Sequence, residues 1–217
     1  MANEIIENKI VITVGREYGS GGHEIAKRLA KKLDIPFYDK EIAQLVAEKG
    51  DLAEKYLLDN EEKAPSYWDF ALPNQTVVTT YYYQSMSQTI YLEQTEMIKE
   101  LAKKGACVIV GRCSDFLLRT IGSINVFVYA SLDKRIERKI KLSKENDNVS
   151  YEAKEMRKMI NSIDKKRKKY YKYYTSQTWG DKTNYDICIN TDKLSIDGAV
   201  DAIISYVKHA VADKGKV

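Results

Sequence analysis

The sequence predicts an α/β protein of three layers, in which helices cover both faces of a central parallel sheet. Short apolar runs rich in β-branched residues recur along the chain, as expected of strands that are buried on both faces. Amphipathic segments follow these runs, so that strands and helices alternate. A glycine-rich turn joins the first run to the first helix. The runs that predict strands most clearly are residues 10–14, 107–110, 124–129 and 184–190.

The most informative stretch begins with the first strand and continues through residues 15–22 (GREYGSGG) into a helix that we expect to start near His23. Glycine adopts positive φ and lets a ligand approach the backbone, and the N–H groups of a first helical turn point at an anion. We therefore predict a phosphate-binding loop. The alternative is a tight strand-to-helix turn with more glycines than it needs.

This loop departs from the regular phosphate-loop motif G-x-x-x-x-G-K-[ST]. The span from Gly15 to Gly21 is one residue too long. If Gly21 takes the place of the second glycine, Gly22 stands at the lysine position and His23 at the Ser/Thr position. The phosphate lysine and the magnesium-binding hydroxyl are then both missing. For His23 itself, phosphate contact and a solvated surface role are both open.

A short second strand is predicted over residues 34–38, and Asp39 follows its carboxyl end. Ligands of open parallel sheets bind at that edge, so Asp39 is a candidate site residue. Its alternative role is the N-cap of the helix predicted over residues 40–49. Residues 50–104 are expected to form a variable helical cover, which ends in a long helix over residues 76–104.

Arg112 comes directly after the buried strand at residues 107–110, at the same edge of the sheet. Its planar guanidinium suits a phosphate, and the alternative is a surface salt bridge. A strong helix is predicted over residues 151–174, and it carries five consecutive cations, Lys165–Lys169, followed by tyrosines. We interpret the region of about residues 143–182 as a lid that brings positive charge to phosphates, against the alternative of a solvated face. Further helices are predicted at residues 116–121, 134–142 and 195–208.

Length and composition fit one soluble domain. The chain has 217 residues, 44% of them hydrophobic, and a formal net charge of +4. This mild charge suits an anionic small molecule and argues against nucleic acid as a partner. The three cysteines have no metal-ligand spacing, and no leader or membrane-length apolar run is visible, so we expect a cytoplasmic protein without membrane contact. Tyr81–Tyr83 on the long helix are a possible homodimer surface.

Four sequence blocks in order resemble the cytidylate kinase-like family, a divergent branch of the P-loop nucleoside monophosphate kinases. The resemblance covers about residues 9–208. It implies a P-loop NTPase-like fold with a helical lid, small-molecule nucleotides as ligands, and use of ATP with Mg²⁺ carried by the nucleotide. The blocks are GREYGSGGHEIAKRLAKKLDIPFYDKEI, CVIVGRCSDFLL, IDKKRKKYYKYYTSQTWGD and NYDICINTDKLSIDGAV.

The resemblance also assigns roles to individual residues. The phosphate loop would bind ATP, and in the absence of the lysine Arg16, Arg112, Lys166 and Arg167 would together supply positive charge. The nucleotide-contacting residues of the loop would be Arg16, Gly19, Ser20, Gly21, Gly22 and His23. Arg112 would hold the acceptor's phosphate and act in catalysis with the lid cations Lys166 and Arg167. The acceptor would be bound by Asp39, Arg112, Cys113 and Asp164.

Two positions differ from the true cytidylate kinases. Cys113 stands where those enzymes carry an aspartate that contacts cytosine, and Val110 stands where an acidic residue would order a magnesium-bound water. No metal site built from protein ligands is expected. Three hypotheses follow. The first is a phosphotransferase acting on a nucleoside monophosphate or related small acceptor, and the second is a catalytically degenerate protein that only binds a nucleotide or phosphate. The third is a nucleic-acid-binding protein that uses Lys165–Lys169 and the tyrosines beside them.

Overall fold

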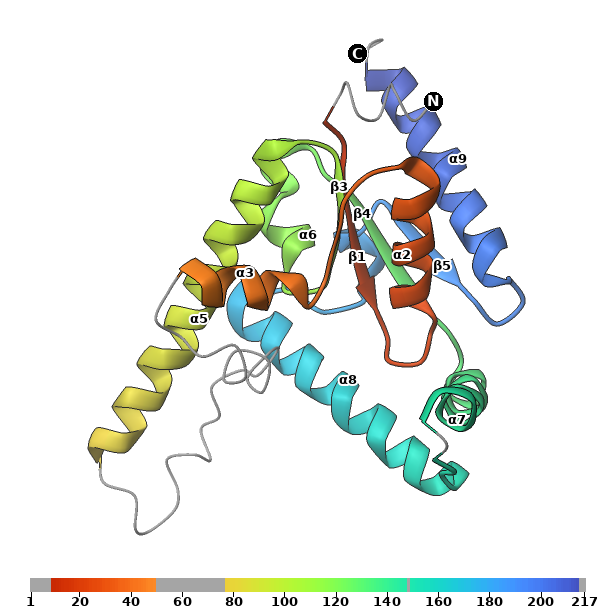
Figure 1. Ribbon diagram of the computed structural model, residues 1–217, viewed down its shortest axis with the longest axis horizontal. Coiled ribbons are helices and arrows are strands. Elements are labelled where there is room, and N and C mark those ends of the chain that lie inside the picture. The colour runs from red at the N-terminus through yellow and green to blue at the C-terminus, as the bar shows by residue number, and fades with distance from the viewer. Residues whose placement is uncertain (1–8, 50–76, 148, 215–217) are drawn as a thin grey trace.

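The protein is described from a computed structural model, which describes residues 9–49, 77–147 and 149–214. Five parallel strands form one sheet in the order β2-β3-β1-β4-β5 (Figure 1). The strands are β1 (Val11–Arg16), β2 (Phe37–Tyr38), β3 (Cys107–Val110), β4 (Ile124–Tyr129) and β5 (Ile187–Asn190). Residues 11–15 of β1 and all of β3 are buried, as the unbroken apolar runs predict.

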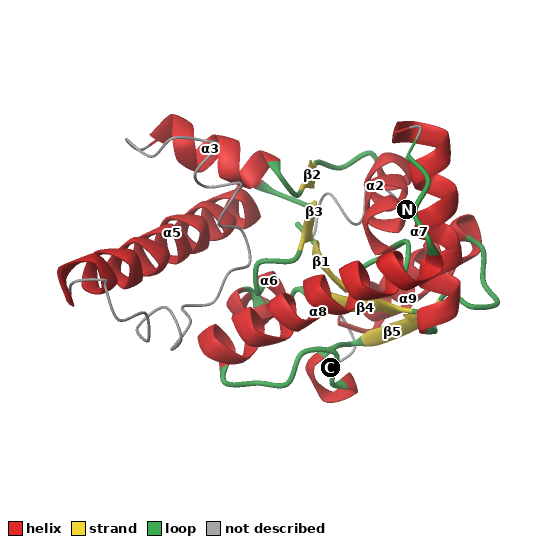
Figure 2. Cartoon of the chain, turned by 90° about the horizontal axis from the view of Figure 1, so that it is seen from below, coloured by secondary structure: helices red, strands yellow, loops and turns green. Residues whose placement is uncertain are grey.

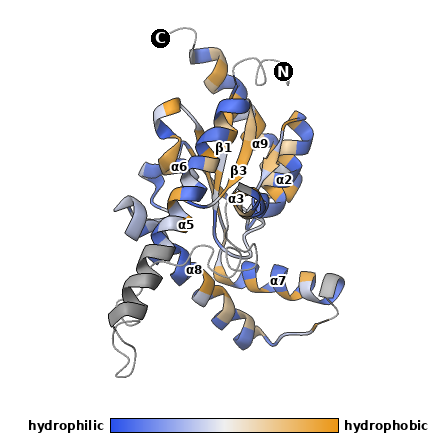
Figure 3. Cartoon of the chain, turned by 60° about the vertical axis from the view of Figure 1, so that its left-hand side comes forward, coloured by the Kyte–Doolittle hydropathy of each residue, from blue (hydrophilic) through white to orange (hydrophobic). Residues whose placement is uncertain are grey.

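Helices cover both faces of the sheet, which gives the predicted three layers. One face packs against α2 (Gly22–Leu33) and α9 (Ile196–Lys214), and the other against α3 (Glu41–Lys49) and α5 (Val77–Lys104). Ile25, Leu29 and Leu33 of α2 are at most 1% exposed, which confirms the predicted apolar face. Figure 3 shows the hydrophobic colouring of β1 and β3 between these layers.

Two further helices lie at the carboxyl end of the sheet. α7 (Leu132–Asp147) packs against α8 (Ala153–Thr175), and α8 extends across the strand ends toward α5 (Figure 2). Met156 and Ile160 join α8 to α7, whereas Tyr170 and Tyr171 pack beside Cys113 at the other end of the helix. The remaining elements are α6 (Ser114–Leu117) and the 3₁₀ helices η2 (Arg119–Ile121) and η3 (Lys182–Asn184).

Several predicted bounds were wrong at helix and strand ends. The final helix does not stop at Lys208 but continues to Lys214, and α7 runs to Asp147 rather than ending at residue 142. The last strand begins only at Ile187, since Asn184 belongs to η3 and the next two residues lie outside the strand. Ser195 caps the final helix, since its Oγ accepts a hydrogen bond of 3.0 Å from the Gly198 N–H. The predicted cover at residues 50–76 and the side chains of Tyr81–Tyr83 lie outside what the structure describes.

Parallel register brings the strand ends together. Val14 of β1 pairs with Val110 of β3, and Tyr38 of β2 pairs with Ile109. The residues that follow these strands therefore lie at one edge of the sheet, beneath α8. They include the glycine-rich loop, Asp39 and Arg112, which the sequence marks as candidates.

Candidate active site

The glycine-rich loop has the backbone geometry that its glycines predict. Gly19 and Gly21 have φ of 84° and 88°, in the left-handed region that favours glycine, and α2 begins at Gly22. The N–H groups of the first turn of α2 have no acceptor within the helix, so they remain available for an anion. The loop thus has the form of a phosphate cradle.

Side chains from outside the loop hold its carbonyl groups. Arg138 donates to the Gly19 carbonyl (2.9 Å), Thr191 Oγ1 donates to the Ser20 carbonyl (2.8 Å), and Arg135 donates to the Tyr18 carbonyl (3.3 Å). The Ser20 hydroxyl is buried and donates to the Glu17 carbonyl at 2.8 Å. Ser20 therefore helps to shape the loop.

Arg16 occupies the space of the missing lysine. A Cβ atom added at Gly22 would lie 2.4 Å from Arg16 Cβ, 3.1 Å from Arg16 Cγ and 3.2 Å from Val128 Cβ. Gly22 does not have a positive φ, so it is this crowding that excludes a side chain there. Arg16, from the end of β1, therefore places a cationic side chain next to the first turn of α2, where the motif would have its lysine.

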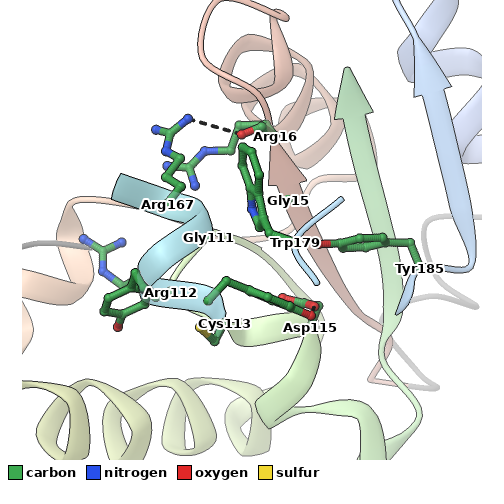
Figure 4. A pocket seen from close by; sticks show the side chains of 11 residues that line it. Gly15, Arg16, Gly111, Arg112, Cys113, Asp115, Arg167, Trp179 and Tyr185 are labelled. Atoms are coloured by element: carbon green, nitrogen blue, oxygen red, sulfur yellow. Dashed lines mark hydrogen bonds between the residues drawn. The ribbon is translucent and has the colours of Figure 1, made fainter. Parts of the chain in front are cut away.

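A small pocket adjoins the loop at the ends of β1 and β3 (Figure 4). Arg16, Arg112 and Arg167 reach it from β1, the end of β3 and α8, and Arg167 donates to the Arg16 carbonyl at 3.2 Å. Its free volume is about 20 Å³, enough for one water molecule. The lining residues are Gly15, Arg16, Gly111, Arg112, Cys113, Asp115, Arg167, Tyr170, Tyr171, Trp179 and Tyr185.

Arg112 is buried and bonded to Asp39, so the surface salt bridge considered for it is wrong. It is 4% exposed, it donates to the Asp39 carbonyl, and its Nη1 lies 3.5 Å from Asp39 Oδ1. His23 Nε2 lies 3.2 Å from Asp39 Oδ2. Burial acts to raise the pKa of Asp39, but the hydrogen bond from His23 and the charges of Arg16 and Arg112 outweigh it, so this pKa lies below its usual value.

Asp115 is a pocket residue that the sequence interpretation missed. It is 4% exposed, and its Oδ2 accepts a hydrogen bond of 2.6 Å from the Tyr171 hydroxyl. Burial raises the pKa of Asp115, while the hydrogen bond from Tyr171 opposes this rise. Cys113, two residues earlier, also lines the pocket and is 3% exposed, with φ of 56°. An acidic residue in the first turn after a strand of the site is the signal that would have indicated Asp115.

α8 places the three predicted lid residues differently: Lys166 and Arg167, predicted to act in catalysis, and Asp164, predicted to bind the acceptor. Arg167 lines the pocket, whereas Lys166 is exposed and is not among the lining residues. Asp164 is 7% exposed, accepts a hydrogen bond from the Tyr18 N–H (2.8 Å) and pairs with Arg135 of α7. Asp164 therefore joins α8, the predicted lid helix, to the glycine-rich loop and to α7. The structure brings Arg16, Arg112, Cys113 and Arg167 together, with Asp39 and His23 at the edge of this group.

The described residues contain no group of three or more His, Cys, Asp or Glu side chains placed to hold a metal ion. Among the helices that the structure describes, none is long and apolar enough to cross a membrane.

Comparison with protein families matches residues 11–193 to the cytidylate kinase-like family. A crystal structure of an uncharacterized protein from Eubacterium ventriosum is similar, with 31% identity, a TM-score of 0.67, and coverage of 92% of this chain and 98% of that one. Shikimate kinase from Bacteroides thetaiotaomicron has 16% identity, coverage of 92% and 98%, and a TM-score of 0.48, too low to add to the assignment. Comparison with curated proteins finds no match.

Proposed function

Because this chain belongs to the cytidylate kinase-like family, we propose that it transfers the γ-phosphate of ATP, supplied with Mg²⁺, to a nucleoside monophosphate or a related small acceptor. Membership in a kinase-like family supports a phosphotransferase. The observation that carries the proposal is the convergence of Arg16, Arg112 and Arg167 beside a phosphate cradle. Phosphoryl transfer depends on positioning and charge neutralisation more than on a covalent group of the protein.

On the ATP side, we assign phosphate binding to the backbone N–H groups at the start of α2 and to Arg16. The stem of Arg16 lies against Gly22, so its guanidinium extends from the position that a phosphate lysine would take. His23 stands in the same first turn and is engaged with Asp39. Mg²⁺, bound with the nucleotide, would neutralise phosphate charge.

On the acceptor side, we assign the acceptor's anionic group to Arg112, which Asp39 orients. Arg167 reaches the same pocket from the lid and would stabilise the charge of the transferred phosphoryl group. Asp115 and Tyr171 lie in the pocket as a hydrogen-bonded pair and would contact the acceptor's polar ring atoms. The pocket volume of about 20 Å³ is far below that of usual ligand sites, so α8 must move before a substrate enters.

A catalytically degenerate protein that only binds a nucleotide is the second candidate. The observation that favours it is the glycine at the lysine position, since loss of one electrostatic donor commonly costs about 10²- to 10³-fold in rate. The two candidates differ in one respect: only the kinase forms ADP and a phosphorylated acceptor.

The test is an assay of purified protein with ATP, Mg²⁺ and a panel of acceptors that includes CMP, dCMP, UMP and AMP. We expect acceptor-dependent ADP formation, and a loss of about 10²-fold or more in kcat/KM in Arg112→Lys, which keeps the charge but loses the planar fork. Arg157→Gln is the matched control because Arg157 lies on α8, is exposed and pairs with Asp133. Thermal stabilisation by nucleotide without any product would establish the binding protein instead.

A further inference from the structure

A line of five lysines runs along the outer side of α8. The side chains are exposed and belong to Lys154, Lys158, Lys165, Lys169 and Lys172, which we call the lysine stripe. At about 100° of rotation per residue they fall within a strip about 60° wide, and at 1.5 Å of rise per residue the strip is about 27 Å long. No acidic residue of the helix falls within this strip.

The lysine stripe does not face the candidate active site. Arg167 follows Lys158 by nine residues, which is about two and a half helical turns, so Arg167 lies on the opposite side of α8. Arg167 lines the pocket beside the phosphate loop. Cations on the opposite side are therefore turned away from the phosphates that the pocket would hold, and the lid role expected for Lys165–Lys169 does not explain them.

On other cationic helices of this protein, several cations lie in ion pairs with acidic side chains. On α2, Arg28 contacts Glu24 and Asp197, and Lys32 contacts Asp201. On α7, Lys134 contacts Glu137. Within the part of the chain that the structure describes, no stripe lysine has an ion-pair partner, although Lys172 Nζ donates to the Ser176 carbonyl at 2.8 Å. The stripe therefore presents positive charge that nearby acidic groups do not neutralise.

The spacing of the stripe lysines destabilises α8. Like charges four residues apart, as in Lys154–Lys158 and Lys165–Lys169, repel each other on a helix surface. Lys154 also lies in the first turn, where the helix dipole disfavours a cation. A merely solvated face would be served better by charges of alternating sign. A polyanion laid along the helix would convert this repulsion into attraction.

The stripe is held rigid at both ends. Met156 and Ile160 are fully buried against α7, and Tyr170 and Tyr171 are buried beside Cys113. Tyr174 stacks on Tyr91 of α5 with ring centroids 3.8 Å apart. The lysine positions are therefore spaced in advance of binding, which reduces the entropy lost when a ligand is bound.

We propose that the lysine stripe binds the phosphate backbone of a single-stranded nucleic acid. Tyr173, 47% exposed at the edge of the stripe, offers a ring on which a base can stack, a contact that suits single strands. A membrane surface fits less well, because the apolar side of α8 is buried within the protein and the stripe side adds little apolar surface. The small net charge of the whole chain does not by itself predict a nucleic-acid partner. Binding to a phosphate backbone depends instead on the charge of the surface that contacts it.

The test is fluorescence anisotropy of labelled oligo(dT) and oligo(U) with the full chain, from about 50 to 200 mM salt. We expect the triple variant Lys158→Gln, Lys165→Gln and Lys169→Gln to bind about tenfold or more weakly at low salt. The slope of log affinity against log salt should fall by about 2, because each phosphate contact to a single strand contributes about 0.7. Tyr173→Ala should weaken binding about fivefold or more through lost stacking.

The control is the triple variant Lys27→Gln, Lys31→Gln and Lys103→Gln, which removes the same charge from exposed positions on α2 and α5. We expect it to bind as the original protein does. Equal weakening in both triple variants would overturn the proposal, because it would show a response to net charge alone. Stripe-dependent binding to phosphatidylserine vesicles without binding to either oligonucleotide would overturn it in favour of a membrane surface. Circular dichroism of the variants confirms that α8 is retained.

Discussion

The two halves of the candidate site are built in different ways. The half proposed to bind ATP, called the ATP half below, is mainly backbone: glycines at positive φ, the start of a helix, and carbonyl groups held from outside by Arg135, Arg138 and Thr191. The half proposed to bind the acceptor, called the acceptor half below, is made of buried side chains in contact with each other, with Arg112 and Asp39 at its centre. We therefore expect the first half to tolerate a departure from its sequence motif, and the second half not to tolerate loss of either partner.

The largest expected effect comes from breaking the acceptor half with Arg112→Ala. The change removes the buried guanidinium and leaves the Asp39 carboxylate with only His23 and the charge of Arg16 as cationic neighbours. We therefore expect the free energy of unfolding to fall by about 3 kcal/mol, the lower end of the usual cost of breaking a buried ion pair. Chemical denaturation measures it. In Asp39→Asn combined with Arg112→Ala, the loss should be smaller than the sum of the two single losses, because the contact between the two side chains is lost only once. An additive result would show that the two residues do not depend on each other.

The structure of the ATP half is tested most directly by Gly22→Lys, which restores the lysine of the regular phosphate-loop motif. A Cβ atom at this position meets Arg16 Cβ at 2.4 Å, so we expect a loss of about 1–3 kcal/mol from overpacking. The double variant Arg16→Gly with Gly22→Lys should recover much of this loss, since it clears the space. If Gly22→Lys is as stable as the original protein, Arg16 does not occupy the lysine position in solution.

The difference between the two halves also explains which parts of the site could be predicted from the sequence. Glycine spacing and strand periodicity are local, so the loop, the strand core and Arg112 at a strand end are predictable from residues near one another in the chain. The acceptor half depends on where α8 crosses the strand ends, which local patterns do not encode. Tyr171 on α8 reaches Asp115 across 56 residues of chain. For the same reason Asp164 pairs with Arg135, a contact that no spacing rule indicates.

A third prediction concerns the contact between the halves and the lid. Asp164→Asn keeps an oxygen for the Tyr18 N–H but loses the charge that pairs with Arg135. We expect a loss of about 1.5–3 kcal/mol, the usual contribution of a hydrogen bond to a charged group. Faster hydrogen exchange at α8 residues than at α2 residues should accompany it, because the lid is then held less firmly. Unchanged exchange at α8 would separate Asp164 from lid closure.

The smallest expected effect is a pair of opposite pH dependences within the acceptor half. The pKa of Asp39 lies below its usual value, so between its folded and unfolded values the unfolded chain binds more protons and stability rises with pH. This contribution is complete above the unfolded pKa of about 3.9 and is lost as pH falls below it. Asp39→Asn should therefore flatten the acid side of the curve of unfolding free energy against pH.

Asp115 should act with the opposite sign, because burial raises its pKa and the folded chain then binds more protons than the unfolded one. Above the folded pKa, the buried charge of Asp115 lowers the free energy of unfolding. This loss disappears as the pH falls toward and below about 3.9, the unfolded pKa. Asp115→Asn should make the rise of stability with pH steeper, where Asp39→Asn makes it shallower. Denaturation curves of both variants between about pH 3 and 7 measure this. If both variants change the slope of unfolding free energy against pH in the same direction, one of the two carboxyl groups does not have the neighbours described.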